Sequence, residues 1–193
     1  MTAQLAAKLT PQEYLAWERE RETKSEFWRG DIFAMAGASR ARNLIIANVV
    51  GELRAQLKGR RCELYPNDMR VFIPRTGMFT YPDVIVVCGT PIFDDARRDT
   101  LLNPTLIVEV LSPSTEGYDR GAKFASYRTI DSLQEYVLLT QTAPLLERYV
   151  RQADTPFWLF ADAAGLNVTV ELTAIACRLA LAEVYDKIEF EPS

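Results

Sequence analysis

The sequence predicts an α/β (α+β) protein in which a central mixed β-sheet is flanked by helices. Strand patterns recur along the chain, some alternating and some almost wholly apolar, and amphipathic helical patterns separate them. Both kinds of element must bury an apolar face against another layer, which favours helices packed on a sheet. The 193 residues contain no repeat, low-complexity tract or Pro/Gly-rich linker, so we expect a single domain over residues 1–193.

The N-terminal part predicts a helix, a hairpin and a second helix. In "LTPQEYLAWERERE", Thr10 is a suitable N-cap, Pro11 suits the first helical position and Glu13 completes a capping box. "KSEFWRGDIFAMAG" indicates a hairpin that turns near Arg29-Gly30. "SRARNLIIANVVGELRAQLKGRR" predicts an amphipathic helix capped by Ser39.

A series of strands follows. "CELYP" and "MRVFIP" alternate, whereas "YPDVIVVCG" and "PTLIVEVLS" are the near-continuous apolar runs of strands covered on both faces. "DDARRD", residues 94–99, predicts an exposed loop between these two runs. "STEGYDRGAKFASYRTI" predicts a helix, with Ser112, Ser114 and Thr115 around its N-terminus as capping residues. The remaining segments predict four strands, "LQEYVLL", "LLERYVR", "FWLFAD" and "LNVTVELT", and a last short helix, "CRLALAEVYDKI".

The composition excludes several classes of chemistry. Histidine is absent, which removes Ser-His-Asp catalysis, histidine-paired cysteine catalysis and most zinc sites. The net charge of −4 provides no overall basic field for binding nucleic acid. Three scattered cysteines without CxxC spacing predict reduced thiols, and no signal peptide or apolar run near a membrane-spanning length is present. We therefore expect a soluble, cytoplasmic protein.

Glu109 interrupts the most apolar run, "LIVEVL". A buried, ionised carboxylate without a partner costs several kcal/mol, so it should be paired, neutral or metal-bound. The alternative is a strand face that reaches solvent, and the residue alone does not distinguish the two. Asp83 begins the other long apolar run, where a turn aspartate is also common. If the two strands pair, the two carboxylates would lie close together and could share a divalent cation such as Mg²⁺.

Lys123 lies about two turns into the helix that follows Glu109. Asp119 and Tyr127 are its i−4 and i+4 neighbours, so the three side chains share one helix face. A lysine there can hold an attacking water or stabilise charge on a phosphate. An ordinary i−4 salt bridge on a solvated face is the alternative.

Together these motifs resemble a known family. Pro82-Asp83, then Glu109, then Lys123 resembles the PD-(D/E)-x-K nuclease pattern. More closely, the sequence is similar to the Uma-two family of restriction-endonuclease-like proteins over roughly residues 10–190. The motifs that carry this resemblance are "SEFWRGDIFAMAGAS", "YPDVIVVCG", "NPTLIVEVLSPST", "YDRGAKFASYRTIDSLQEYVLL" and "ERYVR".

The resemblance implies a restriction-endonuclease-like core with an N-terminal hairpin and extra C-terminal strands. It implies an active site at the ends of two adjacent strands, with Asp83 and Glu109 as metal ligands, Lys123 as the lysine and Glu26 as an additional acidic residue. We expect the Val110 carbonyl to complete the ligands of Mg²⁺ or Mn²⁺, and the reaction to be phosphodiester hydrolysis of DNA or, alternatively, RNA.

Two positions depart from the family pattern. Leu111 stands where the short motif has its lysine, so Lys123 must reach the site from the helix. Asn43 stands where the family commonly carries a histidine, and an amide cannot take up a proton. Candidate phosphate contacts are Arg40, Arg42, Asn43 and Arg70, with solvated surface charges as the alternative for the arginines. Tyr118, Asp119 and Tyr127 are candidates for shaping the pocket, with a core or surface role as the alternative.

Two other functions remain open. A non-catalytic nucleic-acid-binding or assembly module would keep the fold and bind no divalent metal. A sugar hydrolase could use Asp83 and Glu109 as acid and base, but its stacking aromatics are missing, because Trp17, Trp28 and Trp158 are scattered among separate elements. We expect apolar residues of the C-terminal strands to be exposed, which favours a homodimer.

Overall fold

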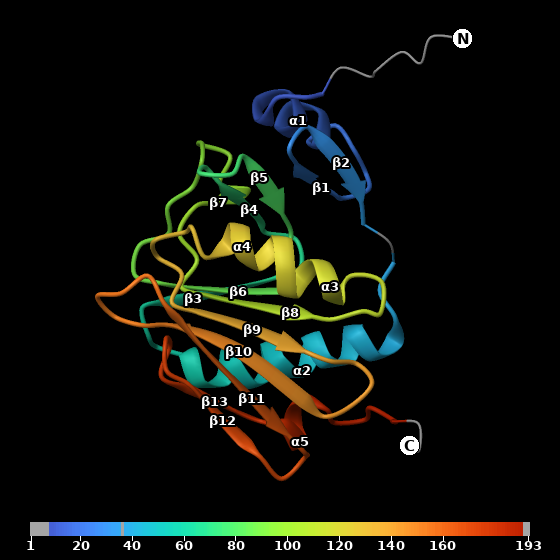
Figure 1. Ribbon diagram of the computed structural model, residues 1–193, viewed down its shortest axis with the longest axis vertical. Coiled ribbons are helices and arrows are strands. Elements are labelled where there is room, and N and C mark those ends of the chain that lie inside the picture. Colours follow the sequence, from blue (N-terminus) through green and yellow to red (C-terminus); the bar gives the residue numbers. More distant parts are fainter. Residues whose placement is uncertain (1–7, 36, 191–193) are drawn as a thin grey trace.

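The computed structural model describes residues 8–35 and 37–190. Within them, helices flank a six-stranded mixed sheet, and a second sheet of five strands packs above it (Figure 1). The prediction of a mixed sheet with an N-terminal hairpin and extra C-terminal strands is therefore confirmed.

The six-stranded sheet has the order β11-β10-β9-β8-β6-β3. β8 runs antiparallel to β6 and parallel to β9, so the two long apolar runs of the sequence lie side by side at its centre. The strands are β3 (Cys62–Pro66), β6 (Val84–Cys88), β8 (Leu106–Val110), β9 (Glu135–Leu139), β10 (Leu145–Arg151) and β11 (Trp158–Ala164).

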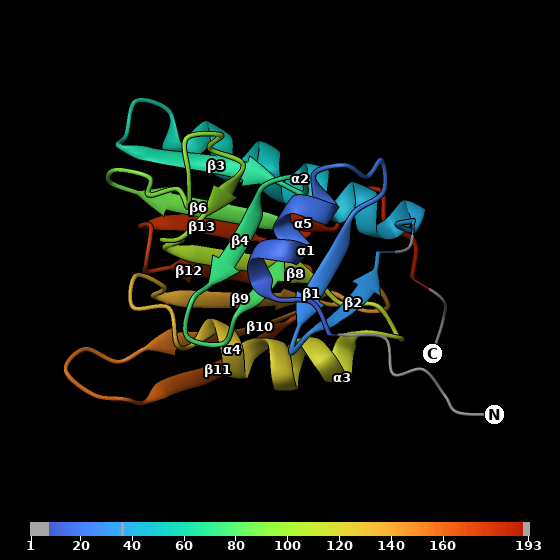
Figure 2. The same ribbon diagram turned by 90° about the horizontal axis from the view of Figure 1, so that it is seen from above.

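Both faces of the central strands β6, β8 and β9 are buried, as the unbroken apolar runs predicted. On one face, α2 (Arg40–Leu57) packs against alternate residues of the central strands, Val108 among them. The hairpin of β12 (Thr169–Leu172) and β13 (Cys177–Ala180), together with α5 (Leu181–Val184), completes that layer. The opposite face, which carries Ile107 and Leu111, packs against the helical segment after β8 and against the second sheet (Figure 2).

The second sheet has the order β2-β1-β5-β4-β7. Its strands are β1 (Ser25–Trp28), β2 (Asp31–Ala34), β4 (Arg70–Ile73), β5 (Met78–Thr80) and β7 (Thr100–Leu101). β1 and β2 form the predicted hairpin, and Arg29 and Gly30 at its turn both have positive φ, as a two-residue type I′ turn requires. α1 (Pro11–Glu18) has the predicted capping box between Thr10 and Glu13, and Ser39 caps α2 as predicted.

Three strands were not predicted as such. β5 and β7 have only three and two residues, too few for a period-2 pattern to appear. "CRLALAEVYDKI" was predicted to be helical throughout, but its first part is β13, which pairs with β12, and only Leu181–Val184 is helical. Tertiary pairing overrides the helix propensity of this alanine- and leucine-rich segment.

The prediction of reduced cysteines is wrong for two of the three. Cys62 and Cys88 are directly opposed in the β3–β6 pair and form a disulfide, whereas Cys177 is a buried free thiol. The cytoplasmic location, which rested partly on reduced cysteines, stays a prediction. In the described part of the chain, no helix has both the length and the apolar character that crossing a bilayer requires.

β11 is an edge strand with large apolar side chains in solvent. Leu159 is 58% exposed and Phe160 is 50% exposed. The expected exposure of apolar residues in the C-terminal strands is therefore confirmed, and self-association through this edge stays a prediction.

Candidate functional site

Glu109 and Asp83 lie at the same end of two hydrogen-bonded strands. Val84 of β6 is the register partner of Val108 of β8, so the residues flanking this pair, Asp83 and Glu109, are neighbours. Both side chains are buried. The sequence left open whether Glu109 is buried or lies on a strand face that reaches solvent, and the structure shows that it is buried.

Glu109 lies under the helical segment that follows β8. α3 (Glu116–Tyr118), a π-helical turn (Asp119–Lys123) and α4 (Phe124–Tyr127) form this segment. The sequence predicted a regular helix and gave no sign of the π turn. Such turns are frequent at functional sites, because the extra residue re-aims the side chains around it.

Lys123, at the end of the π turn, is surrounded by three carboxylates. Its Nζ lies 2.9 Å from Glu109 Oε1, 2.9 Å from Glu26 Oε1 and 3.5 Å from Asp119 Oδ1. Tyr127 donates its hydroxyl to Glu109 Oε1 over 2.9 Å. The predicted common face of Asp119, Lys123 and Tyr127 is therefore present, but it is buried rather than solvated.

Glu26 reaches this cluster from the N-terminal hairpin, as the family resemblance implied. It is buried and accepts hydrogen bonds from the Thr80 hydroxyl and from the backbone N–H of Tyr81. Thr80, in the unpredicted strand β5, also lies 3.2 Å from the Tyr127 hydroxyl. No local pattern around Thr80 indicated that it belongs to the site.

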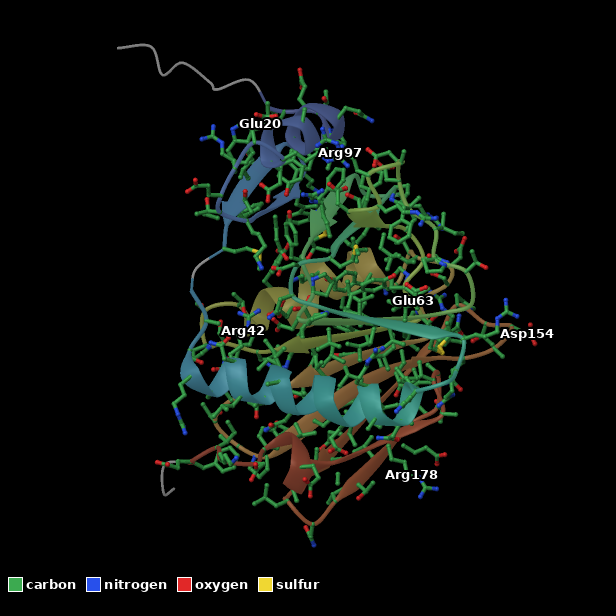
Figure 3. The ribbon with its side chains drawn as sticks, turned by 180° about the vertical axis from the view of Figure 1, so that it is seen from behind. Glu20, Arg42, Glu63, Arg97, Asp154 and Arg178 are labelled. Carbon is green, nitrogen blue, oxygen red and sulfur yellow. A yellow bond between two sulfur atoms is a disulfide. The ribbon has the colours of Figure 1, made fainter. Side chains whose placement is uncertain are left out.

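Asp83 has different partners from Glu109. Arg42 lies in the first turn of α2 (Figure 3). It donates from Nη2 to both Asp83 oxygens, at 2.8 and 3.0 Å, and from Nε over 3.2 Å. The backbone N–H of Val110 donates to Asp83 Oδ2 over 2.8 Å. Val110 therefore meets Asp83 through its N–H, and the metal-binding role expected of its carbonyl stays a prediction.

The protonation states follow from burial and from these pairings. Burial raises the pKa of Glu109 to about 8, against the opposing effect of Lys123. Burial also opposes the ionisation of Glu26, but Lys123 and Thr80 together hold the pKa of Glu26 below its ordinary value. Burial disfavours the charged form of Lys123, yet the surrounding carboxylates outweigh it and hold the pKa of Lys123 well above its usual range. At neutral pH the cluster thus contains a lysine cation, and Glu109 carries a proton.

The cluster forms the floor of a cavity of about 640 Å³. The hairpin and the residues after it form one wall with Phe33, Ala34 and Met35. The segment between β8 and α3 forms the other wall with Ser112, Ser114 and Thr115. Asp83 instead lines a second cavity of about 350 Å³, and Arg42 lines both.

The donor set suits a hard divalent cation. Mg²⁺ is usually held by one or two carboxylates together with water and substrate oxygens, and Asp83 and Glu109 supply two carboxylates from adjacent strands. Among the described residues, Arg42 and Lys123 are the cations that pair with the four buried carboxylates, Asp83, Glu109, Glu26 and Asp119. Loss of the Glu109 proton would therefore add negative charge that a further cation can balance. Within the described residues no three cysteines or carboxylates form a complete metal cage, and Mg²⁺ does not need one.

The candidate phosphate contacts are only partly brought together. Arg42 is at the site, and Asn43 lines the second cavity, but Asn43 donates its amide to the backbone oxygen of Ser39. Arg40 is exposed and lines neither cavity. Arg70 is buried against Tyr81 and Thr100 and also lines neither cavity, so the structure does not bring it to this site, and its contact with phosphate stays a prediction.

The hydroxyls before α3 do not cap the helix as predicted. Thr115 occupies the N-cap position, but its side chain makes no capping hydrogen bond. The Ser112 hydroxyl lies 2.9 Å from that of Thr115 and 3.1 Å from that of Ser114. These groups line the cavity instead, together with Gln141, which the sequence did not indicate.

Comparison with known proteins shows what this chain is similar to. Residues 11–181 match the model of the family Uma2, described as "Putative restriction endonuclease". Two proteins of Synechocystis are similar in sequence. "Uncharacterized protein sll1609" is 39% identical over 86% of this chain and 93% of its own length, and "Uncharacterized protein slr1290" is 35% identical over 95% and 94%.

A solved structure from Anabaena variabilis, described as "a putative nuclease belonging to DUF820", superimposes with a TM-score of 0.76. It covers 92% of this chain and 97% of its own at 17% identity, which shows a shared restriction-endonuclease-like fold. The family match, which spans the whole of the site, and the two relatives show that this chain belongs to the Uma2 family, the Uma-two family that its motifs resemble.

Proposed function

We propose that this protein is a metal-dependent nuclease that hydrolyses phosphodiester bonds of DNA. The observation that carries the proposal is the Lys123 ammonium group, held 2.9 Å from Glu109 on a cavity floor, beside the strand that presents Asp83. Membership of the Uma2 family and the nuclease-like fold support it.

Asp83 and Glu109 would hold Mg²⁺ or Mn²⁺, with the Val110 carbonyl and water as further ligands. A divalent cation bound there supplies Lewis-acid stabilisation of phosphate charge and lowers the pKa of coordinated water. Glu109 must lose its proton to act as a ligand, and the Lys123 ammonium beside it stabilises the resulting carboxylate.

Lys123 and Arg42 would act on the phosphate. Lys123 has three N–H donors, so it can donate to a water or a phosphate oxygen while it keeps a carboxylate partner. Arg42 lines the cavity, and its planar guanidinium matches two phosphate oxygens as well as it matches those of Asp83. Both cations would stabilise the charge that develops on phosphorus.

The test is cleavage of single-stranded, linear duplex and plasmid DNA with Mg²⁺ or Mn²⁺, compared with EDTA. Glu109→Gln and Lys123→Met should each lose at least a hundredfold in rate, on the scale seen when one electrostatic group is removed. Glu135→Gln is the matched control, because Glu135 is a buried glutamate of the adjacent strand β9 that binds Arg148 and lines neither cavity. Cleavage that survives both site variants, or EDTA, would disprove the proposal.

A non-catalytic nucleic-acid-binding module is the second candidate. It is favoured by one observation, the saturation of the proposed ligands by the protein's own cations, Arg42 on Asp83 and Lys123 on Glu109. Such a module would bind DNA equally in EDTA and in Mg²⁺ and would cleave nothing.

A further inference from the structure

The cavity above Lys123 has three chemically distinct surfaces. Phe33 and Met35 make one wall apolar, and the hydroxyls of Ser112 and Ser114 make the facing wall polar. The floor carries the charged cluster around Lys123. A nucleotide has the matching parts, namely a flat apolar base face, hydrogen-bonding edges and a charged phosphate.

Phe33 is directed into this cavity by strand pairing. It is the register partner of Glu26, and directly opposed residues of an antiparallel pair project from the same face. Since Glu26 reaches Lys123, Phe33 lies beside the charged cluster, where it lines the cavity and is 47% exposed. An exposed aromatic ring next to the cluster that we propose to bind phosphate provides a platform for stacking a base.

Tyr118 supplies a second, independent observation. Its ring lies against Trp28 and near the Lys123 ammonium, and it lines the cavity. Its hydroxyl is buried and has no hydrogen-bond partner among the residues that the structure describes. Buried polar groups are almost always hydrogen-bonded, so this hydroxyl indicates a ligand that completes it.

The volume of the cavity and the net charge of the protein favour binding of a single strand over a duplex. A cavity of about 640 Å³ is within the range that encloses one small molecule, and Lys123 at its floor is buried. For a phosphate to reach that floor, its sugar and base must enter the cavity with it. A flexible single strand allows this, whereas a stiff duplex would have to be deformed. With a net charge of −4, affinity must come from stacking and hydrogen bonds more than from neutralising many phosphates.

We propose that this cavity binds one unpaired nucleotide of a single-stranded nucleic acid, with the base stacked on Phe33 and a polar group of the nucleotide bonded to the Tyr118 hydroxyl. This rests on the proposed nuclease function and narrows its substrate to unpaired strands and ends. DNA and RNA both supply the base and phosphate groups that this cavity would contact, so the test includes a single strand of each.

The test measures fluorescence anisotropy of a labelled oligonucleotide with Ca²⁺ in place of Mg²⁺. The probes are single-stranded DNA, single-stranded RNA, the same DNA as a duplex, and an abasic DNA strand of equal length and charge. Single-stranded DNA or RNA should bind about tenfold more tightly than the duplex and the abasic strand, the scale of one stacked base.

Phe33→Ala should weaken binding of the single strand about tenfold, and Tyr118→Phe about fivefold. Phe157→Ala is the matched control, because Phe157 is 70% exposed and lines neither cavity. Equal binding of duplex and single strand, or equal effects of Phe33→Ala and Phe157→Ala, would overturn the inference. Absence of cleavage with Mg²⁺ and Mn²⁺, with this binding pattern intact, would instead refute the nuclease proposal alone.

Discussion

Arg42 occupies the oxygens of Asp83 that the proposed metal would need. Its guanidinium bonds both carboxylate oxygens, at 2.8 and 3.0 Å from Nη2, and the Val110 N–H adds a further bond. Metal binding at Asp83 would therefore release Arg42, and Arg42 also lines the cavity where a phosphate would lie. One arginine would thus link the metal-free state of the site with the proposed metal-bound state.

Replacing Arg42 with methionine should have opposite effects on stability and on metal affinity. Asp83 would remain buried without its cation, which should lower the free energy of unfolding in EDTA by about 3 kcal/mol. Mg²⁺ would no longer compete with a guanidinium, so it should bind more tightly and restore much of the lost stability. Urea unfolding with and without Mg²⁺ measures both effects.

Arg40→Met is the control for this experiment. Arg40 lies two residues earlier in the same helix turn and is exposed. It should change neither the EDTA stability nor the Mg²⁺ dependence appreciably. Equal destabilisation by Arg42→Met with and without Mg²⁺ would show that no metal binds at Asp83.

Glu109→Gln should stabilise the metal-free protein while abolishing metal binding. The pKa of Glu109 is raised from 4.5 to about 8, so its contribution to stability is complete below pH 4.5 and is lost as the pH rises toward 8. Glutamine mimics the protonated form at every pH. The variant should match the wild type near pH 4.5 and exceed it at pH 7 by up to about 3 kcal/mol.

Unfolding in urea at both pH values measures this difference. Calorimetric titration with Mg²⁺ provides the second readout, in which Glu109→Gln loses the binding heat and Glu135→Gln retains it. The stability of Glu109→Gln minus that of the wild type should be larger at pH 7 than at pH 4.5. A smaller difference at pH 7 would contradict the assigned protonation of Glu109.

The sequence was sufficient to predict the central strands and to suggest that the strand after Asp83 and the strand that contains Glu109 lie side by side. A strand that is buried on both faces appears in the sequence as a continuous apolar segment, and an acidic residue at such a segment is easily identified. The N-termini of α1 and α2 could also be predicted, because the Thr10 and Ser39 hydroxyls accept hydrogen bonds from backbone N–H groups only three residues later.

What could not be predicted depends on contacts between distant residues. The bond from Arg42 to Asp83 spans 41 residues, and the bond from Thr80 to Glu26 spans 54. The π turn at Asp119–Lys123 differs from an α-helix by a single inserted residue, which the apolar periodicity of so short a segment does not reveal. The interior of the site was therefore beyond the reach of local patterns.

The Cys62–Cys88 disulfide should account for a measurable part of the stability. It joins opposed residues of β3 and β6 across a separation of 26 residues, and closing such a loop in the unfolded chain stabilises the fold by about 3 kcal/mol. Reduction, or Cys62→Ser, should lower the free energy of unfolding by that order.

Cys177→Ser separates this effect from the loss of any thiol, since Cys177 is free and buried. Alkylation of the denatured, unreduced protein followed by mass spectrometry should find one modified cysteine. Three modified cysteines would show that the pair is reduced in the purified protein.

Metal affinity should increase with pH up to the pKa of Glu109. Below about pH 8 the Glu109 carboxyl is protonated, and a cation must displace that proton, whereas above it the ligand is already ionised. The apparent affinity for Mg²⁺ should therefore rise about tenfold per unit between pH 6 and 8 and then level off. Burial also raises the pKa of Asp119, whereas Lys123 and Thr80 hold the pKa of Glu26 below its ordinary value against the effect of burial.

Calorimetry at pH 7 in two buffers of different ionisation enthalpy measures the displaced proton directly. Most Glu109 side chains are protonated at that pH, so binding should release nearly one proton per Mg²⁺ ion. The apparent binding enthalpies in the two buffers should therefore differ by nearly the full difference between the ionisation enthalpies of the buffers. Glu135→Gln should show the same difference. Identical enthalpies in both buffers, together with an affinity that is flat from pH 6 to 8, would mean that Mg²⁺ binds without Glu109, and the role of this strand carboxylate as a metal ligand would have to be abandoned.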